Sequence, residues 1–290
     1  MAEVAELIHV ASLLHDDVLD DAATRRGLRA LNAEVGNKLA ILAGDFLLAR
    51  ASVTLASLRE PDVIMLLSTV IEHLVTGEVM QMTARPEELT SFEHYAAKTH
   101  FKTASLIALS CKAVALLGSG GDVAASAPHA GGAHVLSGAA SPQQRHHAAT
   151  PAAAAAAAEA AYQYGRHLGL AFQYVDDVLD LTGTPSLLGK PALSDLRGGI
   201  ATAAVLHASL SHPPLVAAIG RRFKLPGDVE AAVDAVSAHG GVAAARALAA
   251  DHSRMARDAL RDFPPPACDH AAAAREGLEE LTHRVLQRTK

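Results

Sequence analysis

Apolar residues recur every three or four positions along most of this 290-residue chain. Side chains at this spacing lie on one face of an α-helix, whereas a half-buried strand alternates apolar and polar residues. Alternating stretches are scarce in the sequence. We therefore expect an all-α fold, in which long helices pack around a central cavity. The spacing predicts helical segments over 1–21, 36–58, 61–83, 90–117, 156–184 and 228–262.

Local signals mark the ends of several of these segments. Pro61 with Asp62 opens one segment, and Thr90 with Glu93 is typical of a capping box, in which side chains bond the free backbone groups of a helix start. Regular spacing fails between about residues 118 and 155, where glycine, serine, histidine and proline precede an alanine run. We interpret this stretch as a low-complexity insertion in a single domain spanning 1–290. The alanine run is expected to join the helix that follows it.

Charge and hydropathy narrow the functional classes. The chain carries 25 Lys and Arg against 31 Asp and Glu, for a net charge of −6. It has no overall basic field, so we expect no nucleic-acid partner, and an anionic substrate must be bound locally. No uninterrupted apolar run reaches the roughly 20 residues of a membrane-spanning helix, so we expect no membrane span. Cys111 and Cys268 match no zinc or disulfide spacing.

The pentapeptide Asp-Asp-Val-Leu-Asp occurs twice, at 16–20 and at 176–180, each time within an apolar helical stretch. Residues four apart share a helix face, so each copy presents two carboxylates one turn apart. A single acidic pair is usually a solvated surface, but apolar flanks make that interpretation unfavourable, because buried carboxylates require a counter-ion. Mg²⁺ binds one or two carboxylates and completes its octahedron with water and phosphate oxygens. The repeat therefore predicts a Mg²⁺-dependent diphosphate site.

Basic residues follow both acidic clusters in the sequence. Arg25 and Arg26 come after the first cluster, and Lys190 comes after the second. Lys98 and Lys102 are four residues apart, which predicts that they share one helix face. A guanidinium binds phosphate through two parallel hydrogen bonds. Each of these residues alone is ordinary surface charge, but as an ordered set they favour phosphate binding.

These motifs, in this order, resemble the trans-polyprenyl diphosphate synthase family. The resemblance covers nearly everything outside the insertion and rests on 14–21, 25–27, 44–47, 77–81, 102–104, 172–177, 189–190 and 194–196. Residues 73–78 and 282–286 resemble the long-chain solanesyl or decaprenyl synthases of eukaryotic ubiquinone synthesis.

The resemblance implies an isoprenoid-synthase-type helical bundle and a transferase. Its reaction condenses isopentenyl diphosphate with an allylic diphosphate into a long-chain all-trans polyprenyl diphosphate, solanesyl or decaprenyl, for a quinone side chain. The bound metals and cations stabilise the charge that develops on the departing diphosphate. The resemblance also implies a homodimer, a peripheral membrane contact for product release, and a mitochondrial location, with a plastid as the alternative.

The resemblance further implies a role for each matching residue. Three Mg²⁺ ions per site would be held by the two clusters, that is by Asp16, Asp17, Asp20, Asp176, Asp177 and Asp180. The allylic substrate would be contacted by Arg25, Lys102, Thr103, Gln173 and Lys190, and isopentenyl diphosphate by Arg26. The candidate catalytic residues are Asp16, Asp20, Lys102, Asp176 and Lys190.

One departure from the family pattern leaves an alternative open. The Gly-Gly-Lys…Arg segment that binds isopentenyl diphosphate in the family has no match in this sequence, so we expect the N-terminal helices of the bundle to be missing from it. The alternative function is a non-catalytic or regulatory subunit of a heteromeric prenyl synthase. Two intact acidic clusters argue against it. A class I terpene cyclase is disfavoured, because cyclases stabilise carbocations with aromatic rings and this chain has no Trp and 3% aromatics.

Product length is expected to depend on the helix before the first cluster, because a chain growing from a clamped diphosphate runs along that helix. Ser12 lies one turn before Asp16, Ala11 is its neighbour, and Ile8 lies one turn further. In the resembling family, bulky aromatics at the positions of Ala11 or Ser12 stop growth at short products. Small side chains here therefore predict a product beyond geranylgeranyl, although small residues also permit close helix packing.

Overall fold

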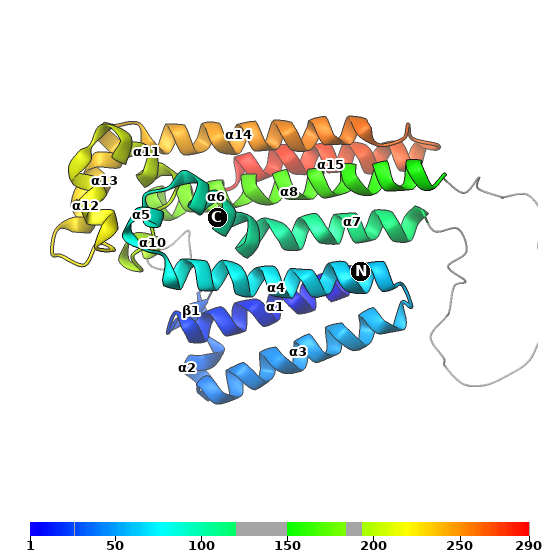
Figure 1. Cartoon of the computed structure of the whole chain (residues 1–290), viewed down its shortest axis with the longest axis horizontal. Coiled ribbons are helices and arrows are strands. Elements are labelled where there is room, and N and C mark those ends of the chain that lie inside the picture. Colours follow the sequence, from blue (N-terminus) through cyan, green and yellow to red (C-terminus); the bar gives the residue numbers. More distant parts are fainter. Residues whose placement is uncertain (26, 120–149, 184–192, 290) are drawn as a thin grey trace, which may run out of the picture.

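Helices make up almost all the regular structure of the computed structural model, which describes residues 1–25, 27–119, 150–183 and 193–289. The seven long helices run along one axis (Figure 1): α1 (Ala2–Leu19), α3 (Asn37–Ser57), α4 (Pro61–Thr83), α7 (Ser105–Ser119), α8 (Pro151–Thr182), α14 (Gly241–Ala259) and α15 (Asp269–Gln287). The short helices are α2 (Leu31–Val35), α5 (Pro86–Leu89), α6 (Phe92–Thr99), α10 (Ser194–Arg197), α11 (Ala203–Ser211), α12 (Pro213–Gly220) and α13 (Asp228–Ala238). The expected all-α fold is confirmed.

Two short elements complete this description. A π-helical turn, η1 (His100–Ala104), joins α6 to α7, and a 3-10 turn, η2 (Leu260–Asp262), follows α14. In the part of the chain that the structure describes, the β-structure is one antiparallel ladder between β1 (Thr24–Arg25) and β2 (Leu28–Arg29). This ladder turns the chain just after the first acidic cluster.

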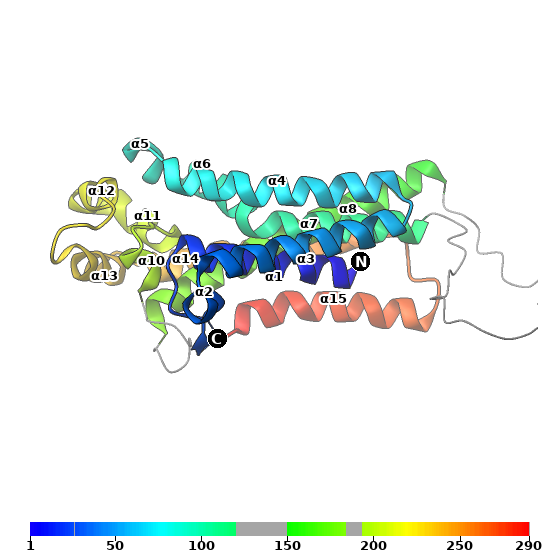
Figure 2. The ribbon, with the colours of Figure 1, turned by 90° about the horizontal axis from the view of Figure 1, so that it is seen from below.

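Helix α8 lies between α7 and α14, while α4 packs on α7 and α1 packs on α3. Figures 1 and 2 show that β1, which follows α1, and α10, which follows α8, lie at the same end of the bundle. Both acidic clusters are therefore carried to one end, beside the short helices α10 to α13.

The apolar core is divided among three clusters of buried side chains. The largest joins α8 to α11, α12, α13 and α14, and a small one joins α8, α14 and α15. The cluster between α1, α3, α4 and α7 includes the fully buried Ile8 and Leu67. Each such side chain contributes about 1.5–3 kcal/mol on burial. Of the 18 residues of α1 only four are buried, against 14 of the 32 residues of α8.

Three details differ from the sequence predictions. The N-cap of α6 is Ser91, whose Oγ accepts from the His94 amide at 3.2 Å, so the capping box expected at Thr90 and Glu93 was wrong by one residue. The segment predicted over 228–262 is two helices, because Gly240 adopts φ +70° between them. The segment predicted over 90–117 contains the π turn η1.

The ends of the expected insertion are helical. Helix α7 continues to Ser119, and α8 begins at Pro151 and includes the alanine run, as expected. Thr150 caps α8, its Oγ1 accepting from the Ala153 amide at 3.3 Å. Residues 120–149, with most of the insertion, lie outside the described residues, and the domain assignment stays a prediction.

Three helical stretches are long and apolar enough to cross a membrane by length and composition, namely Asn37–Ser57, Pro61–Thr83 and Phe92–Ser119. The sequence criterion overlooked them because charged residues such as Asp45 interrupt each run without lowering its mean hydropathy below 1.4. In the fold, 22–28% of their most apolar windows is buried. Helix α3 accordingly presents exposed apolar side chains.

Candidate functional site

The first acidic cluster occupies the last turns of α1, where its middle carboxylate is bound inside the protein. Asp17 is 3% exposed, and its Oδ1 accepts from Nε and Nη2 of Arg25 at 2.7 and 2.5 Å. The Asn32 amide donates to the carbonyl oxygens of Asp17 and Ala22 at 3.1 Å each. These bonds fix the turn after α1, so Arg25, expected to contact substrate, is paired with Asp17 in this structure.

Asp16 and Asp20 lie one turn apart, as expected, and neither carboxylate is hydrogen-bonded to another side chain among the described residues. Burial raises the pKa of Asp16 to about 6; Lys102 opposes this and Glu78 adds to it. Burial also raises the pKa of Asp20. Because the carboxylates lie close together and are partly desolvated, this position favours a bound cation.

Lys102 lies beside the first cluster and forms an ion pair with Glu78 of α4. Burial lowers the pKa of Lys102, but Asp16 and Glu78 outweigh it and raise that pKa above its usual range. The pair depends on close approach of α4 to η1. A Cβ at Gly77 would lie 2.8 Å from the Lys102 amide nitrogen, closer than van der Waals contact allows.

The second cluster, on the last turns of α8, has two buried carboxylates. Asp177 is 3% exposed and accepts from the Tyr95 hydroxyl and, at 2.8 Å, from Nε2 of Gln173. The Thr103 hydroxyl donates to Oε1 of Gln173 at 2.8 Å. Burial raises the pKa of Asp177 to about 6, against the hydrogen bonds from Tyr95 and Gln173.

Asp180 and Asp176 have different surroundings. Asp180 is 1% exposed and caps α10, accepting from the Ser194 hydroxyl at 2.6 Å and from the amides of Ser194 and Asp195 at 3.3 and 3.0 Å. The Asp176 side chain is 41% exposed and lies 3.6 Å from Nη2 of Arg288. Asp176 is therefore the second-cluster carboxylate most open to a ligand.

The π turn η1 begins between Lys98 and Lys102, the two lysines that were expected on one helix face. A π turn contains slightly more than four residues, so positions four apart still lie on nearly the same face. Lys102 forms an ion pair with Glu78 and is attracted by Asp16, whereas Lys98 is attracted by Asp177 and Asp195 and less strongly by Glu78. The two lysines differ in their strongest carboxylate neighbours, and their placement on one helix face stays a prediction.

The donor set of the clusters fits a hard divalent cation. Within the described ranges, no three His, Cys, Asp or Glu side chains converge into a complete metal site. Mg²⁺ does not need one, because it keeps water and takes substrate phosphate oxygens. The open carboxylates of Asp16, Asp20 and Asp176 supply the oxygen ligands that this ion prefers.

The chain-length candidates lie where α1 meets the core. Ile8 and Ala11 are fully buried, and Ile8 packs in the cluster between α1, α3, α4 and α7. The Ser12 hydroxyl donates to the His9 carbonyl at 2.8 Å. Their role in product length stays a prediction. Arg26 and Lys190 lie outside the described residues.

Several residues at the site were missed by the sequence interpretation. Glu78 belongs to the family motif at 77–81, but no role was assigned to it. Tyr95 lies seven residues, or two helical turns, before Lys102, and this spacing could have indicated that Tyr95 lies near the site. The position of Arg288, stacked 3.9 Å from the centre of the Phe172 ring and near Asp176, had no sequence signal.

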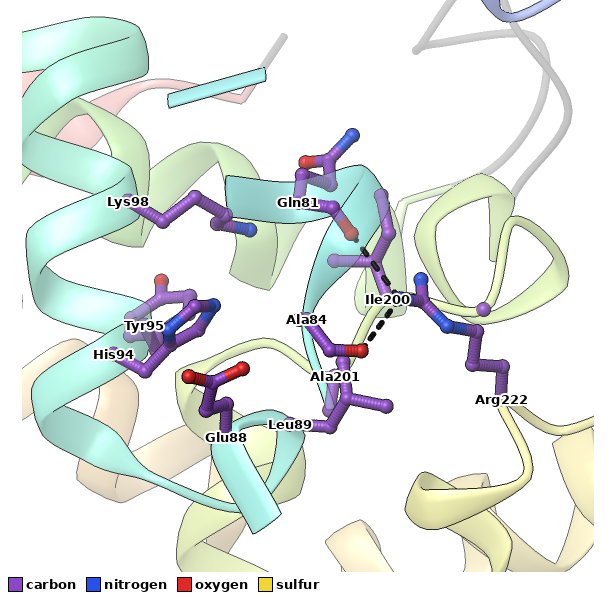
Figure 3. Close-up of a pocket in the computed structure, with 11 residues that line it drawn as sticks. Gln81, Ala84, Glu88, Leu89, His94, Tyr95, Lys98, Ile200, Ala201 and Arg222 are labelled. Atoms are coloured by element: carbon purple, nitrogen blue, oxygen red, sulfur yellow. Dashed lines mark hydrogen bonds between the residues drawn. The ribbon is translucent and has the colours of Figure 1, made fainter. Parts of the chain in front are cut away.

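A small cleft lies beside Tyr95, the residue that donates to Asp177 of the second cluster (Figure 3). It separates the end of α4 from α6 and from the segment after α10. Arg222 closes one side by donating to the carbonyls of Gln81, Met82 and Ala84 at 3.2–3.4 Å. Lys98 and Tyr95 lie side by side on the opposite wall.

The sequence matches the family described as polyprenyl synthetase over residues 1–132 and 140–236. The chain belongs to the polyprenyl synthetase family. It is 44% identical over its whole length to "Solanesyl-diphosphate synthase 1, mitochondrial" of Oryza sativa subsp. japonica and 40% identical to the all trans-polyprenyl-diphosphate synthase of Homo sapiens, and covers 60% of each. The chain thus spans about three fifths of the length of these curated relatives.

Solved polyprenyl synthetase structures share the fold. The apo form of an Arabidopsis medium/long-chain length prenyl pyrophosphate synthase superposes with a TM-score of 0.75 at 40% identity, covering 100% of this chain and 81% of that one. The polyprenyl synthase of Caulobacter crescentus, complexed with calcium and isoprenyl diphosphate, gives 0.78 at 33% identity, with 99% and 77% covered. The expected family and helical fold are confirmed.

Proposed function

We propose that the protein is a prenyltransferase that condenses isopentenyl diphosphate with an allylic diphosphate to make a long-chain all-trans polyprenyl diphosphate. The observation that carries this proposal is the placement of two acidic clusters at one end of the bundle, with the Lys102–Glu78 ion pair beside the first of them. Relatives named solanesyl, decaprenyl and hexaprenyl synthases favour a long product for a quinone side chain, and the names of several support a mitochondrial location.

In this proposal three Mg²⁺ ions per site are held by Asp16, Asp20 and Asp176. The neighbouring carboxylates, which are hydrogen-bonded within the protein, keep these ligands in place; they are Asp17, Asp177 and Asp180. Mg²⁺ would stabilise the negative charge of the departing diphosphate. Lys102 neutralises oxygens beside the first cluster. Thr103 donates to Gln173 and Gln173 donates to Asp177, which leaves one Gln173 N–H as a fixed donor to the allylic diphosphate. Fixed donors of this kind lower the barrier because they need no reorganisation during the reaction.

We also propose a homodimer formed through α3. Leu39, Leu42, Phe46 and Val53 recur on one face of this helix and are each more than half exposed. A large apolar face on a soluble protein marks an interaction surface. The product itself is a lipid, so its release needs a peripheral contact with a bilayer.

The test is condensation of farnesyl diphosphate with labelled isopentenyl diphosphate by this chain, with Asp176→Ala as the inactive control. A Mg²⁺-dependent product longer than geranylgeranyl is expected. If the chain forms no product alone but changes the output of an active relative mixed with it, the regulatory-subunit alternative replaces this proposal. If it does neither, the assignment of activity is wrong.

A further inference from the structure

Lys98 is a half-buried lysine that the expected substrate contacts do not include. It lines the cleft of Figure 3, and its Nζ lies 5.4 Å from the centre of the Tyr95 ring. Burial lowers the pKa of Lys98, and the carboxylates of Asp177 and Asp195 oppose that shift. An ammonium in such a position is costly unless its charge compensates a buried carboxylate.

Asp177 connects Lys98 to the residues that face substrate. One of its oxygens accepts from Tyr95, which stacks under Lys98, and the other accepts from Gln173. Both polar atoms of the Gln173 amide are hydrogen-bonded, because its nitrogen donates to Asp177 and its oxygen accepts from the Thr103 hydroxyl. The Thr103 proton is therefore directed at Gln173, and the second N–H of the Gln173 amide is the donor that the network leaves for a ligand.

We propose that Lys98 is a positioning residue, whose charge compensates the buried Asp177 carboxylate and so holds the Gln173 amide with one N–H toward the diphosphate. This inference rests on the proposed function. It differs in kind from the role of Lys102, which pairs with Glu78 and faces the first cluster. A lysine that merely competed with Mg²⁺ for the second cluster would have the opposite effect on metal binding.

The experiment is calorimetric titration of Mg²⁺ with inorganic diphosphate into the folded chain. Lys98→Met is expected to weaken binding by about tenfold, equal to about 1.4 kcal/mol, and Lys98→Arg to restore it to within about threefold. Lys112→Met is the matched control. Lys112 also lies 5.4 Å from a tyrosine ring, that of Tyr162, and 3.4 Å from Glu159, but it belongs to neither cluster.

Binding by Lys98→Met that equals or exceeds wild-type binding overturns the inference, because Lys98 is then only a competing charge. Absence of binding by the wild-type chain contradicts the proposed function instead, so the two failures are distinct. If Lys98→Met does not fold, Tyr95→Phe decides, since it removes only the hydroxyl that donates to Asp177. Weaker binding by Tyr95→Phe supports the inference, and unchanged binding overturns it.

Discussion

In each acidic cluster, adjacent aspartates have different surroundings. Asp17 and Asp177 are each 3% exposed and accept hydrogen bonds from Arg25 or from Tyr95 and Gln173. Successive residues on a helix point about 100° apart, so a doubled aspartate sends one carboxylate inward and the other toward the site. The members of each pair are therefore not interchangeable, and within each pair Asp16 or Asp176 is the carboxylate open to a ligand.

Substitution of the two neighbours should separate metal binding from stability. We expect Asp16→Asn to weaken Mg²⁺ binding by about 10- to 100-fold and to leave the melting temperature nearly unchanged. Asp17→Asn should lower the free energy of unfolding by about 1–3 kcal/mol, because it leaves the Arg25 guanidinium without its partner. Calorimetry and thermal unfolding measure the two effects. Loss of Mg²⁺ binding in Asp17→Asn without a change in melting would contradict this division.

The raised pKa of Asp16 predicts a pH dependence of Mg²⁺ binding. Its pKa is about 6 in the fold against 3.8 for the free side chain. The folded chain without metal thus binds the Asp16 proton more tightly than the unfolded chain does. Protonated Asp16 therefore adds to the free energy of unfolding below about pH 4, and this contribution is lost as pH rises through about 6. Mg²⁺ needs the ionised carboxylate, so its affinity should fall by up to about tenfold per pH unit below pH 6. Titrations near pH 5 and pH 7 test this, and equal affinities would refute it.

The sequence predicted which carboxylates gather at the site but not how each is used. The repeat placed Asp16 with Asp20 and Asp176 with Asp180 one turn apart, which the helices α1 and α8 bear out. Whether a carboxylate is open depends on groups far away in the chain, such as Tyr95 for Asp177 and Ser194 for Asp180. Spacing along one helix carries no information about such partners.

Among the helical elements, the π turn η1 has the largest effect on where the side chains and backbone near the site lie. It carries Lys102, which forms an ion pair with Glu78, and it places the Lys102 backbone against Gly77 of α4. A four-residue spacing has the same appearance in a regular helix and in one that contains a π turn. The long helices were therefore predictable from periodicity, while this turn was not, because tertiary contacts decide it.

Gly77→Ala tests the contact between α4 and η1. The added methyl would lie 2.8 Å from the Lys102 amide nitrogen and 3.1 Å from its Cβ, so the helices must separate. We expect a loss of about 1–3 kcal/mol in stability and weaker diphosphate binding as Lys102 moves from Glu78. Gly118→Ala is the matched control, since its Cβ meets nothing within 4 Å and alanine favours a helix by about 1 kcal/mol. A Gly77→Ala chain as stable as Gly118→Ala would argue against close packing here.

For the molecule as a whole, the exposed face of α3 predicts its assembly. Phe46→Glu places a charge in the centre of the apolar row Leu39, Leu42, Phe46 and Val53. We expect light scattering to give a dimer for the wild type and a monomer for Phe46→Glu, because burying an unpaired carboxylate in an interface is costly. Val114→Glu, at an exposed apolar position on α7, should leave the dimer intact. A wild-type chain that stays monomeric at micromolar concentration would contradict the dimer.

The two acidic clusters stand on helices of unequal burial, and this sets the order in which they are lost. Helix α1 buries four of its 18 residues, whereas α8 buries 14 of its 32 and lies between two neighbours. Amide hydrogens exchange sooner where few apolar contacts hold a helix. As denaturant rises, protection should vanish from α1 while α8 is still closed. Half of the proposed metal-binding site should therefore unfold before the bundle does, and a diphosphate bound to both clusters would act as a cross-link that makes the two parts unfold together.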